Sequence, residues 1–412
     1  MEPRKLRGAQ IAKAGGIRQR AEHLWLVPSQ SHSGNWLVDY DNEDGAPTCT
    51  CPDFADRWAF CKHIFAIEIH ERRISMPDET PPKKKYTQNW SAYNKAQTNE
   101  RAHVVELLNG LCQGITSPEQ QGRGRPRKPM ADMVFASAMK VYTGMSGRRA
   151  QSEIDRCYEE GLISVPIRYN TISLYMRDPA LTPLLRKLVQ ESAAPLTDLE
   201  KVFAFDGTGF GTSVHDRYFV DKHGTKEQKA ARGKRDFVRG HAACGVVSNI
   251  CTDLIVTESK GKGTGETTQF EGLLNGTNQH FDISEVLADK AYSTQAILRA
   301  VDDLGAVPWI PYKSNTVAKT GPAIWKKMFY YFRCHEEKFA EHYHRRSNVE
   351  TMFHMVKAKF GGSVRSKDTV SQANEVYLKV LCHNIVVLTH SIYEHDLVPE
   401  FWKGGSTDEE TG

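Results

Sequence analysis

Long apolar runs are absent from this 412-residue sequence, and neither sign of charge is in large excess. No run approaches the roughly 18 apolar residues that span a bilayer. The start, MEPRKLRGAQIAKAGG, lacks the apolar middle of a signal peptide. The nine cysteines are an odd number, which does not suggest a secreted disulfide scaffold. We therefore expect a cytoplasmic protein, and the net charge of +4 gives weak support to nucleic-acid binding.

The chain is longer than one hydrophobic core usually supports, so two or three domains are expected. Turn residues, basic stretches and apolar periodicity predict an α/β protein with five parts. These are a small ββα module, a basic linker, a helical module, a mixed α/β catalytic domain and a tail, at residues 1–72, 73–129, 130–195, 196–395 and 396–412. Strands are expected at VFAFD, RYFVD, GHAACGVVSN, DLIVTES, EVLAD and VPWIPY, and helices at TQAILRAVDDL and from Gln372 to about Ser391.

Three cysteines and one histidine cluster in the first part. Cys49, Cys51, Cys61 and His63 are spaced as C-x-C, nine residues, then C-x-H. Three thiolates and one imidazole suit a tetrahedral Zn²⁺ ion, and four protein ligands leave no position for water, so the zinc would be structural. The alternative is a chance cluster of buried thiols. The segment TCTCPDFADRWAFCKHIFAI resembles the SWIM zinc finger, which implies binding of DNA or of protein.

Two basic stretches are candidates for DNA contact. Arg123, Arg125 and Arg127 lie in RGRPRK, which resembles an AT-hook and suits a narrow minor groove. The alternative is a solvated basic linker. In the helical module, SGRRAQSEIDRCYEEG and PIRYNTISLYMRDP could form a helix-turn-helix that exposes Arg168, Tyr169, Thr171 and Arg177. An ordinary helical bundle with a solvated face explains that pattern almost as well.

Carboxylates after apolar strands are the candidate ligands for divalent metals. Phosphodiester transfer uses hard cations such as Mg²⁺ or Mn²⁺, which prefer oxygen donors. Asp206 ends VFAFD and Asp289 ends VLAD, so two predicted strands each deliver an aspartate at their end. Taken singly, each aspartate would more often belong to a turn or a helix cap.

A third carboxylate lies in HYHRRSNVETMFHMVKAKF. On one continuous helix, Tyr343, Arg346, Glu350 and Lys357 would fall within a sector of roughly 60°. The adjacent sector is apolar and would anchor the helix to a core; it holds Val349, Phe353, Val356 and Phe360. The polar sector places Glu350 where it could share metals with the aspartates. The alternative is a surface helix with an Arg–Glu pair.

Taken in order, VFAFDGT, VLADKAY and Y-x2-R-x3-E-x6-K resemble the catalytic motifs of DDE transposases of bacterial insertion sequences. The resemblance implies a ribonuclease-H-like fold with Asp206, Asp289 and Glu350 as ligands of two Mg²⁺ or Mn²⁺ ions. It also implies that Tyr343, Arg346 and Lys357 contact DNA near the cut. Ala291 stands where the family usually has glycine. The expected partners are element ends and target DNA, bound by a homodimer at the nucleoid.

Two other functions use the same features. A ribonuclease-H-like nuclease or resolvase would employ the same carboxylates without joining strands. A catalytically silent, transposase-derived regulator would use the zinc module and RGRPRK to bind DNA. His241, on an expected strand after a basic stretch, could approach DNA but is better explained as a structural histidine.

Overall fold

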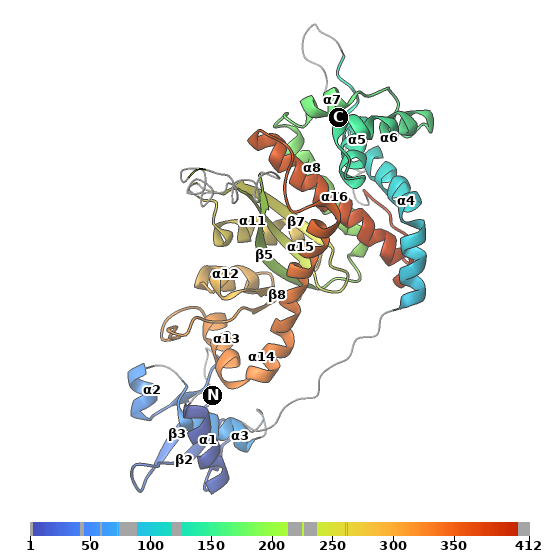
Figure 1. Cartoon of the computed structure of the whole chain (residues 1–412). Helices are drawn as coiled ribbons and strands as arrows, with labels where there is room; N and C mark the ends of the chain where they lie inside the picture. Colours follow the sequence, from blue (N-terminus) through green and yellow to red (C-terminus); the bar gives the residue numbers. More distant parts are fainter. Residues whose placement is uncertain are drawn as a thin grey trace, which may run out of the picture. The chain divides into compact units, whose positions relative to one another are not determined.

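The computed structural model describes residues 3–41, 45–57, 60–71, 73, 89–117, 126–212, 225, 237–259, 261 and 263–402. Arg123, Arg125 and the expected strand RYFVD lie outside these residues. Contacts within the chain group it into two compact units (Figure 1). The first comprises Met1–Thr87 and Ile283–Arg346, and the second comprises Gln88–Asp282 and Ser347–Gly412. The fold is mixed α/β, as expected, and the domain boundaries expected from the sequence stay predictions.

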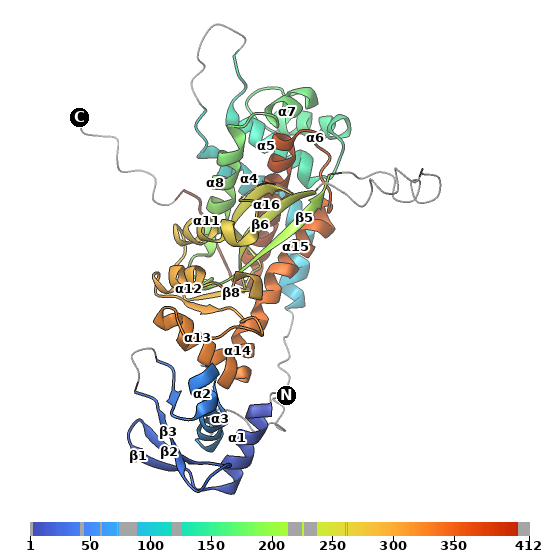
Figure 2. The same cartoon turned by 90° about the vertical axis from the view of Figure 1, so that its left-hand side faces the viewer.

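The N-terminal part of the first unit is a four-stranded antiparallel sheet with three helices (Figure 2). The strands are adjacent in chain order: β1 (Arg18–Ala21), β2 (Leu24–Pro28), β3 (Asn35–Asp39) and β4 (Thr48–Cys49). The helices are α1 (Pro3–Ala14), α2 (Pro52–Arg57) and α3 (Lys62–His70). Alternation along β2 buries Trp25 and Val27. The predicted hairpin and helix are β2, β3 and α3, and the other elements are additional.

The rest of the first unit follows a β-α-β pattern and then continues as helices. Strands β8 (Glu285–Ala288) and β9 (Val307–Trp309) pair in parallel, with α12 (Gln295–Asp302) between them in the chain. Helices α13 (Ala323–Cys334) and α14 (Glu336–Tyr343) come next. The Phe60 ring lies 5.7 Å from that of Phe329 and 5.3 Å from that of Tyr330. Aromatic packing therefore joins the N-terminal part to α13 in one core.

The second unit begins with a long helix where the sequence predicted a linker with one short helix. Helix α4 (Trp90–Gln113) has 24 residues, beyond the expected Ala102–Leu111. It buries Val104, Leu108 and Leu111, and it contacts α5 and α16. The expectation was wrong here because the polar residues before Ala102 form the exposed part of one amphipathic helix.

Four helices follow and confirm the predicted helical stretches. They are α5 (Met130–Tyr142), α6 (Gly147–Glu159), α7 (Tyr169–Tyr175) and α8 (Leu181–Ala193). The two glycines read as turn signals, Gly144 and Gly161, have φ of 65° and 75°. Side chains other than glycine rarely adopt this left-handed conformation, so both positions end a helix without strain.

The core of the second unit is an antiparallel sheet covered on both faces (Figure 1). Its strands are β5 (Val202–Gly211), β6 (Phe237–Gly245) and β7 (Cys251–Glu258). Helix α11 (Glu266–Asn278) covers one face, where the rings of Phe205 and Phe270 lie 4.9 Å apart. Helices α15 (Ser347–Phe360) and α16 (Thr369–Glu394) pack on the other face. In the described part of this unit, helix α11, the sheet and helix α15 thus form three layers.

Helix α16 is long and apolar enough to cross a membrane if judged by length and composition. In this structure, however, 83% of its most apolar window is buried inside the protein. Helices α4, α5 and α8 and strand β7 all contact it. These contacts are those of a core helix, and they confirm the prediction that this segment packs against the domain.

Candidate functional site

Asp206 occupies the middle of β5, not the strand end that the sequence predicted. The strand continues through Gly211 because Gly207 and Gly209 keep their ladder pairs with β6. Asp206 is half-buried, and its Oδ1 accepts a hydrogen bond of 2.8 Å from the backbone N–H of Gly207. Side chains alternate along a strand, so Asp206 shares a face with Thr208 and Phe210.

Helix α15 runs along this same face of β5. Near its start, the carbonyl oxygen of Asn348 lies 4.0 Å from the Cys244 sulfur, and Cys244 pairs with Ala204 on β5. Towards its end, the Lys357 ammonium donates a hydrogen bond of 2.6 Å to the hydroxyl of Thr208. The helix is therefore fixed to the sheet at two levels, at Cys244 on β6 and at Thr208 on β5.

Asp206 and Glu350 both fall between these two contacts. A strand advances about 3.3 Å per residue, and a helix advances about 1.5 Å. Glu350 comes two residues after the first contact on α15, and Asp206 comes two residues after it on β5. Glu350 is exposed to solvent, and the neighbouring Val349 is fully buried. The structure thus places two of the predicted carboxylates on adjacent elements in one unit.

Lys357 is half-buried against Thr208 and Phe210, on the face of β5 that also carries Asp206. Its ammonium lies 5.3 Å from the centre of the Phe210 ring. Burial lowers the pKa of this amine from its usual value, because desolvation disfavours the charged form. Thr208, which orients Lys357, was not identified from the sequence, although it follows Asp206 with one residue between them.

Asp289, Tyr343 and Arg346 belong to the first unit. Asp289 directly follows β8, as predicted, and its Oδ1 accepts a hydrogen bond of 2.5 Å from the N–H of Ala291. The guanidinium of Arg346 lies 5.9 Å from the centre of the Tyr343 ring. Because Asp289 belongs to this unit, its grouping with Asp206 and Glu350 stays a prediction.

One continuous signature helix was expected, and this expectation was wrong. Helix α14 ends at Tyr343, a 3₁₀ turn covers His344–Arg346, and α15 begins at Ser347. A 3₁₀ turn has about three residues per turn, so the helical angle counted across it does not hold. The shared face is kept by Glu350 and Lys357, which both lie on α15.

Glu285 anchors the segment around this turn, and no sequence pattern predicted this contact. Glu285, the first residue of β8, accepts a hydrogen bond of 2.6 Å from the Arg345 guanidinium, and its carboxylate lies 2.8 Å from His342 Nδ1. The His342 ring stacks on Trp309 with 4.1 Å between ring centres. The strand that leads to Asp289 is therefore tied to the segment that ends at Arg346.

His241 faces away from Asp206. It pairs with Gly207 in the ladder, so it lies on the face of the sheet that α11 covers. The ring is fully buried, and its Nε2 lies 3.0 Å from the hydroxyl of Thr257. Burial lowers the pKa of His241 to about 4, so the ring is neutral at pH 7. These contacts support the structural explanation of this histidine.

The four predicted zinc ligands converge in the first unit. Cys49 lies on β4, Cys51 precedes α2, Cys61 caps α3 and His63 lies in its first turn. All four are buried, and their donor atoms lie within 4.8 Å of one another. His63 Nδ1 is 3.8 Å from the Cys49 sulfur and 3.6 Å from the Cys61 sulfur. Zn–S bonds of about 2.3 Å give a tetrahedron edge of about 3.8 Å, so the residues fit zinc.

The structure describes the end of the basic stretch RGRPRK and the whole of the predicted helix-turn-helix. Arg127 forms an ion pair of 3.3 Å with Asp178, and the Lys128 N–H donates to the Tyr175 hydroxyl at 2.7 Å. This end of RGRPRK is therefore held against the helical module. Helices α6 and α7 contact each other at the predicted helix-turn-helix. Arg168 and Arg177 are exposed there as predicted, whereas Tyr169 and Thr171 are half-buried.

This chain is similar to a protein-family model and to a solved structure. A cryo-EM structure of a piggyBac transposase synaptic complex with hairpin DNA is similar over 75% of this chain and 76% of that chain, with 11% identity and a TM-score of 0.35. Residues 197–385 match the family model described as the transposase DDE domain. This span contains Asp206, Asp289 and Glu350. The chain thus carries a segment of the transposase DDE domain type.

Proposed function

We propose that this protein is a DNA transposase of the bacterial insertion-sequence type. It would cut DNA at the ends of a mobile element and join the freed ends to target DNA. The observation that carries the proposal is the placement of Asp206 and Glu350 at neighbouring levels of β5 and α15, inside the span that matches the transposase DDE domain. A ribonuclease-H-like arrangement would bring Asp289 to the same centre.

The carboxylates would hold two Mg²⁺ or Mn²⁺ ions. Such ions activate the attacking oxygen and stabilise the leaving oxygen of a phosphodiester. Asp206 is fixed in the middle of a strand, which suits a ligand that must stay rigid. Glu350 is exposed at the edge of α15, where DNA can reach it. The Lys357 ammonium, held by Thr208, would contact a phosphate near the cut.

The reaction would proceed in two balanced steps without a covalent enzyme intermediate. Water attacks the phosphodiester at the element end, and the strand breaks to leave a 3′ hydroxyl and a 5′ phosphate. The 3′ hydroxyl then attacks a phosphodiester of the target, displacing one target oxygen as a new 3′ hydroxyl. A homodimer at the nucleoid would pair the two ends.

The Cys49, Cys51, Cys61 and His63 cluster would hold a structural zinc ion in a SWIM-type module. All four donors come from the protein, so no position is open for catalysis. The ion would stabilise a part of the first unit whose own core is small.

The test is metal-dependent cleavage and strand transfer on DNA that carries the gene's flanking ends. Wild type is compared with Asp206→Asn, Asp289→Asn and Glu350→Gln, and with Glu271→Gln, an exposed carboxylate on α11. We expect the control to cut and join like wild type, and the three variants to bind DNA without cutting it. If all variants cut like wild type, the catalytic assignment is wrong. If wild type binds the ends but never cuts, the protein is a DNA-binding regulator.

A further inference from the structure

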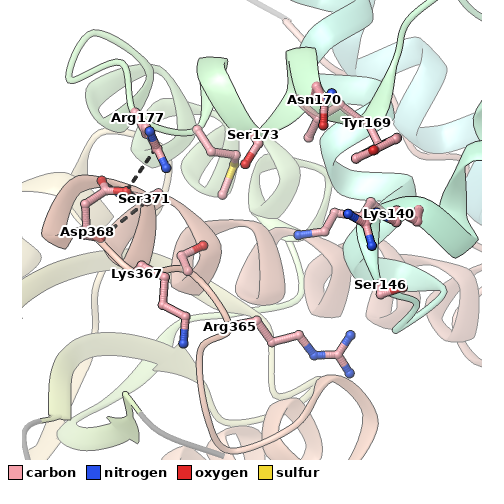
Figure 3. Close-up of a pocket in the computed structure, with 15 residues that line it drawn as sticks. Lys140, Ser146, Tyr169, Asn170, Ser173, Arg177, Arg365, Lys367, Asp368 and Ser371 are labelled. Carbon is pink, nitrogen blue, oxygen red and sulfur yellow. Dashed lines mark hydrogen bonds and ion pairs between the residues drawn. The ribbon is translucent and has the colours of Figure 1, made fainter.

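A pocket of about 430 Å³ lies in the second unit (Figure 3). Neither Asp206 nor Glu350 lines it. Four segments form it: the end of α5, the start of α6, helix α7 with the two residues that follow it, and the segment 365–368 with the start of α16. Its lining holds five basic residues against one acidic residue. The basic residues are Lys140, Arg148, Arg177, Arg365 and Lys367.

Four of these basic side chains have no anionic partner among the described residues. Arg177 does have one, because its guanidinium lies 3.4 Å from Asp368. Asp368 is also engaged by the N–H of Ser371, at 3.0 Å, as the N-cap of α16. The lining acid is therefore already satisfied, and Figure 3 shows Lys140, Arg365 and Lys367 around the remaining space. An unneutralised cluster of this kind attracts an anion.

The segment that carries Arg365 and Lys367 is held from beneath by two buried charges on α16. Glu375 accepts hydrogen bonds from the N–H groups of Arg365 (3.0 Å) and Ser366 (2.9 Å) and from the Ser366 hydroxyl (2.7 Å). Glu375 is 4% exposed, so these bonds are shielded from water. The backbone at Arg365 is thus fixed before any ligand binds.

Lys379 supports the preceding residues in the same way. Its ammonium donates to the carbonyl oxygens of Gly361 (2.8 Å) and Ser363 (2.6 Å), and it lies 3.9 Å from Glu375. Lys379 is 3% exposed. Glu375 and Lys379 together hold this short connecting segment in place. A segment that is fixed in advance loses little conformational entropy on binding, as in a preorganised binding site.

We propose that this pocket binds phosphates of the DNA backbone. Arginine, lysine and hydroxyl groups are the usual partners of backbone phosphates, and Ser146 and Ser173 also line the pocket. Duplex DNA presents closely spaced phosphates, which suits cations supplied by four separate segments. The inference rests on the proposed function in taking DNA as the partner, and it adds a second contact besides the catalytic centre.

The connecting segment couples the pocket to both catalytic elements of this unit. It begins directly after α15, which carries Glu350. The N–H of Val364 donates to the carbonyl of Gly211 at 2.8 Å, and Gly211 ends β5, which carries Asp206. A phosphate bound by Arg365 is therefore held at a fixed place relative to Asp206 and Glu350. The pocket would set the register of the duplex for cutting.

The test measures binding of a short DNA duplex, in metal-free buffer, over a series of salt concentrations. The slope of log K against log salt is negative, and each lost phosphate contact lowers its magnitude, here called the salt slope, by about 0.9. We expect Arg365→Gln to lower the salt slope by about 0.9, and Lys140→Gln/Arg365→Gln to lower it by about 1.8, for specific and unrelated duplexes alike. Lys95→Gln is the matched control, because Lys95 is exposed on α4 and has no ion pair in the described chain.

Salt slopes of the pocket variants equal to that of Lys95→Gln would overturn the proposal. It would also fall if inorganic phosphate at low concentration displaced the duplex completely, since the pocket would then be a free-phosphate site. If wild type binds no DNA, this proposal and the transposase proposal fail together. If wild type binds but does not cut, while the pocket variants show a lower salt slope, the pocket proposal stands and the transposase proposal fails.

Discussion

Glu375→Gln should loosen the segment 361–368 without unfolding the protein. Glu375 makes three hydrogen bonds as a carboxylate, to Arg365 N–H, Ser366 N–H and the Ser366 hydroxyl. A charged acceptor strengthens each bond about twofold over a neutral one, so each loses about 1 kcal/mol when the amide replaces the carboxylate. The three losses sum to about 3 kcal/mol. Lys379 would in addition lose its charged neighbour at 3.9 Å.

Hydrogen exchange of the amides in residues 364–366 measures this change directly, because local opening exposes them. A loss of about 3 kcal/mol corresponds to exchange about a hundredfold faster. Glu394→Gln, an exposed carboxylate on the same helix, is the control and should leave exchange unchanged. Exchange in Glu375→Gln within about threefold of wild type would refute the reasoning, because the hydrogen bonds would then contribute less than 1 kcal/mol.

Three further predictions concern buried charges and the zinc cluster. Arg186→Met removes the partner of fully buried Asp253, and should lower the free energy of unfolding by about 3 kcal/mol at pH 7. Burial raises the pKa of Asp253, and Arg186 opposes that rise. Without Arg186, the folded variant therefore protonates Asp253 more readily as the pH falls, which removes the unpaired buried charge. The loss should therefore shrink as denaturation is repeated at lower pH, and a pH-independent loss would contradict this. We expect elemental analysis to find about one zinc per chain in wild type and none in Cys61→Ser; zinc retained at full occupancy in the variant would exclude the cluster as its site. Glu68→Gln should lower the free energy of unfolding by about 2 kcal/mol, because fully buried Glu68 accepts a hydrogen bond from the Tyr330 hydroxyl, and an unchanged free energy of unfolding would show that this bond contributes nothing.

Sequence patterns predicted most helices and strands, because buried and exposed residues alternate along a strand and buried residues recur every three or four positions along a helix. The helix expected from Gln372 to about Ser391, which is α16, the turns at Gly144 and Gly161 and the zinc ligands all depend on short-range spacing. Their physical causes act within a few residues of the chain, so one sequence is enough to identify them.

Other features depend on contacts between distant segments, and these were missed. The strand after Asp206 continues because β6 supplies ladder partners for Gly207 to Gly211. Helix α4 exists where composition predicted a linker, because α16 covers its apolar side. The anchor at Glu285 and the support from Glu375 likewise join residues that no local spacing connects.

The most direct test of the central claim is whether Asp206 and Glu350 bind one divalent metal together. Manganese binding to the protein–DNA complex is measured by electron paramagnetic resonance for wild type, Asp206→Asn, Glu350→Gln and the control Glu271→Gln. The account predicts that each of the first two variants weakens manganese binding at least tenfold and that the control does not. Undiminished manganese binding in Asp206→Asn and Glu350→Gln would contradict it.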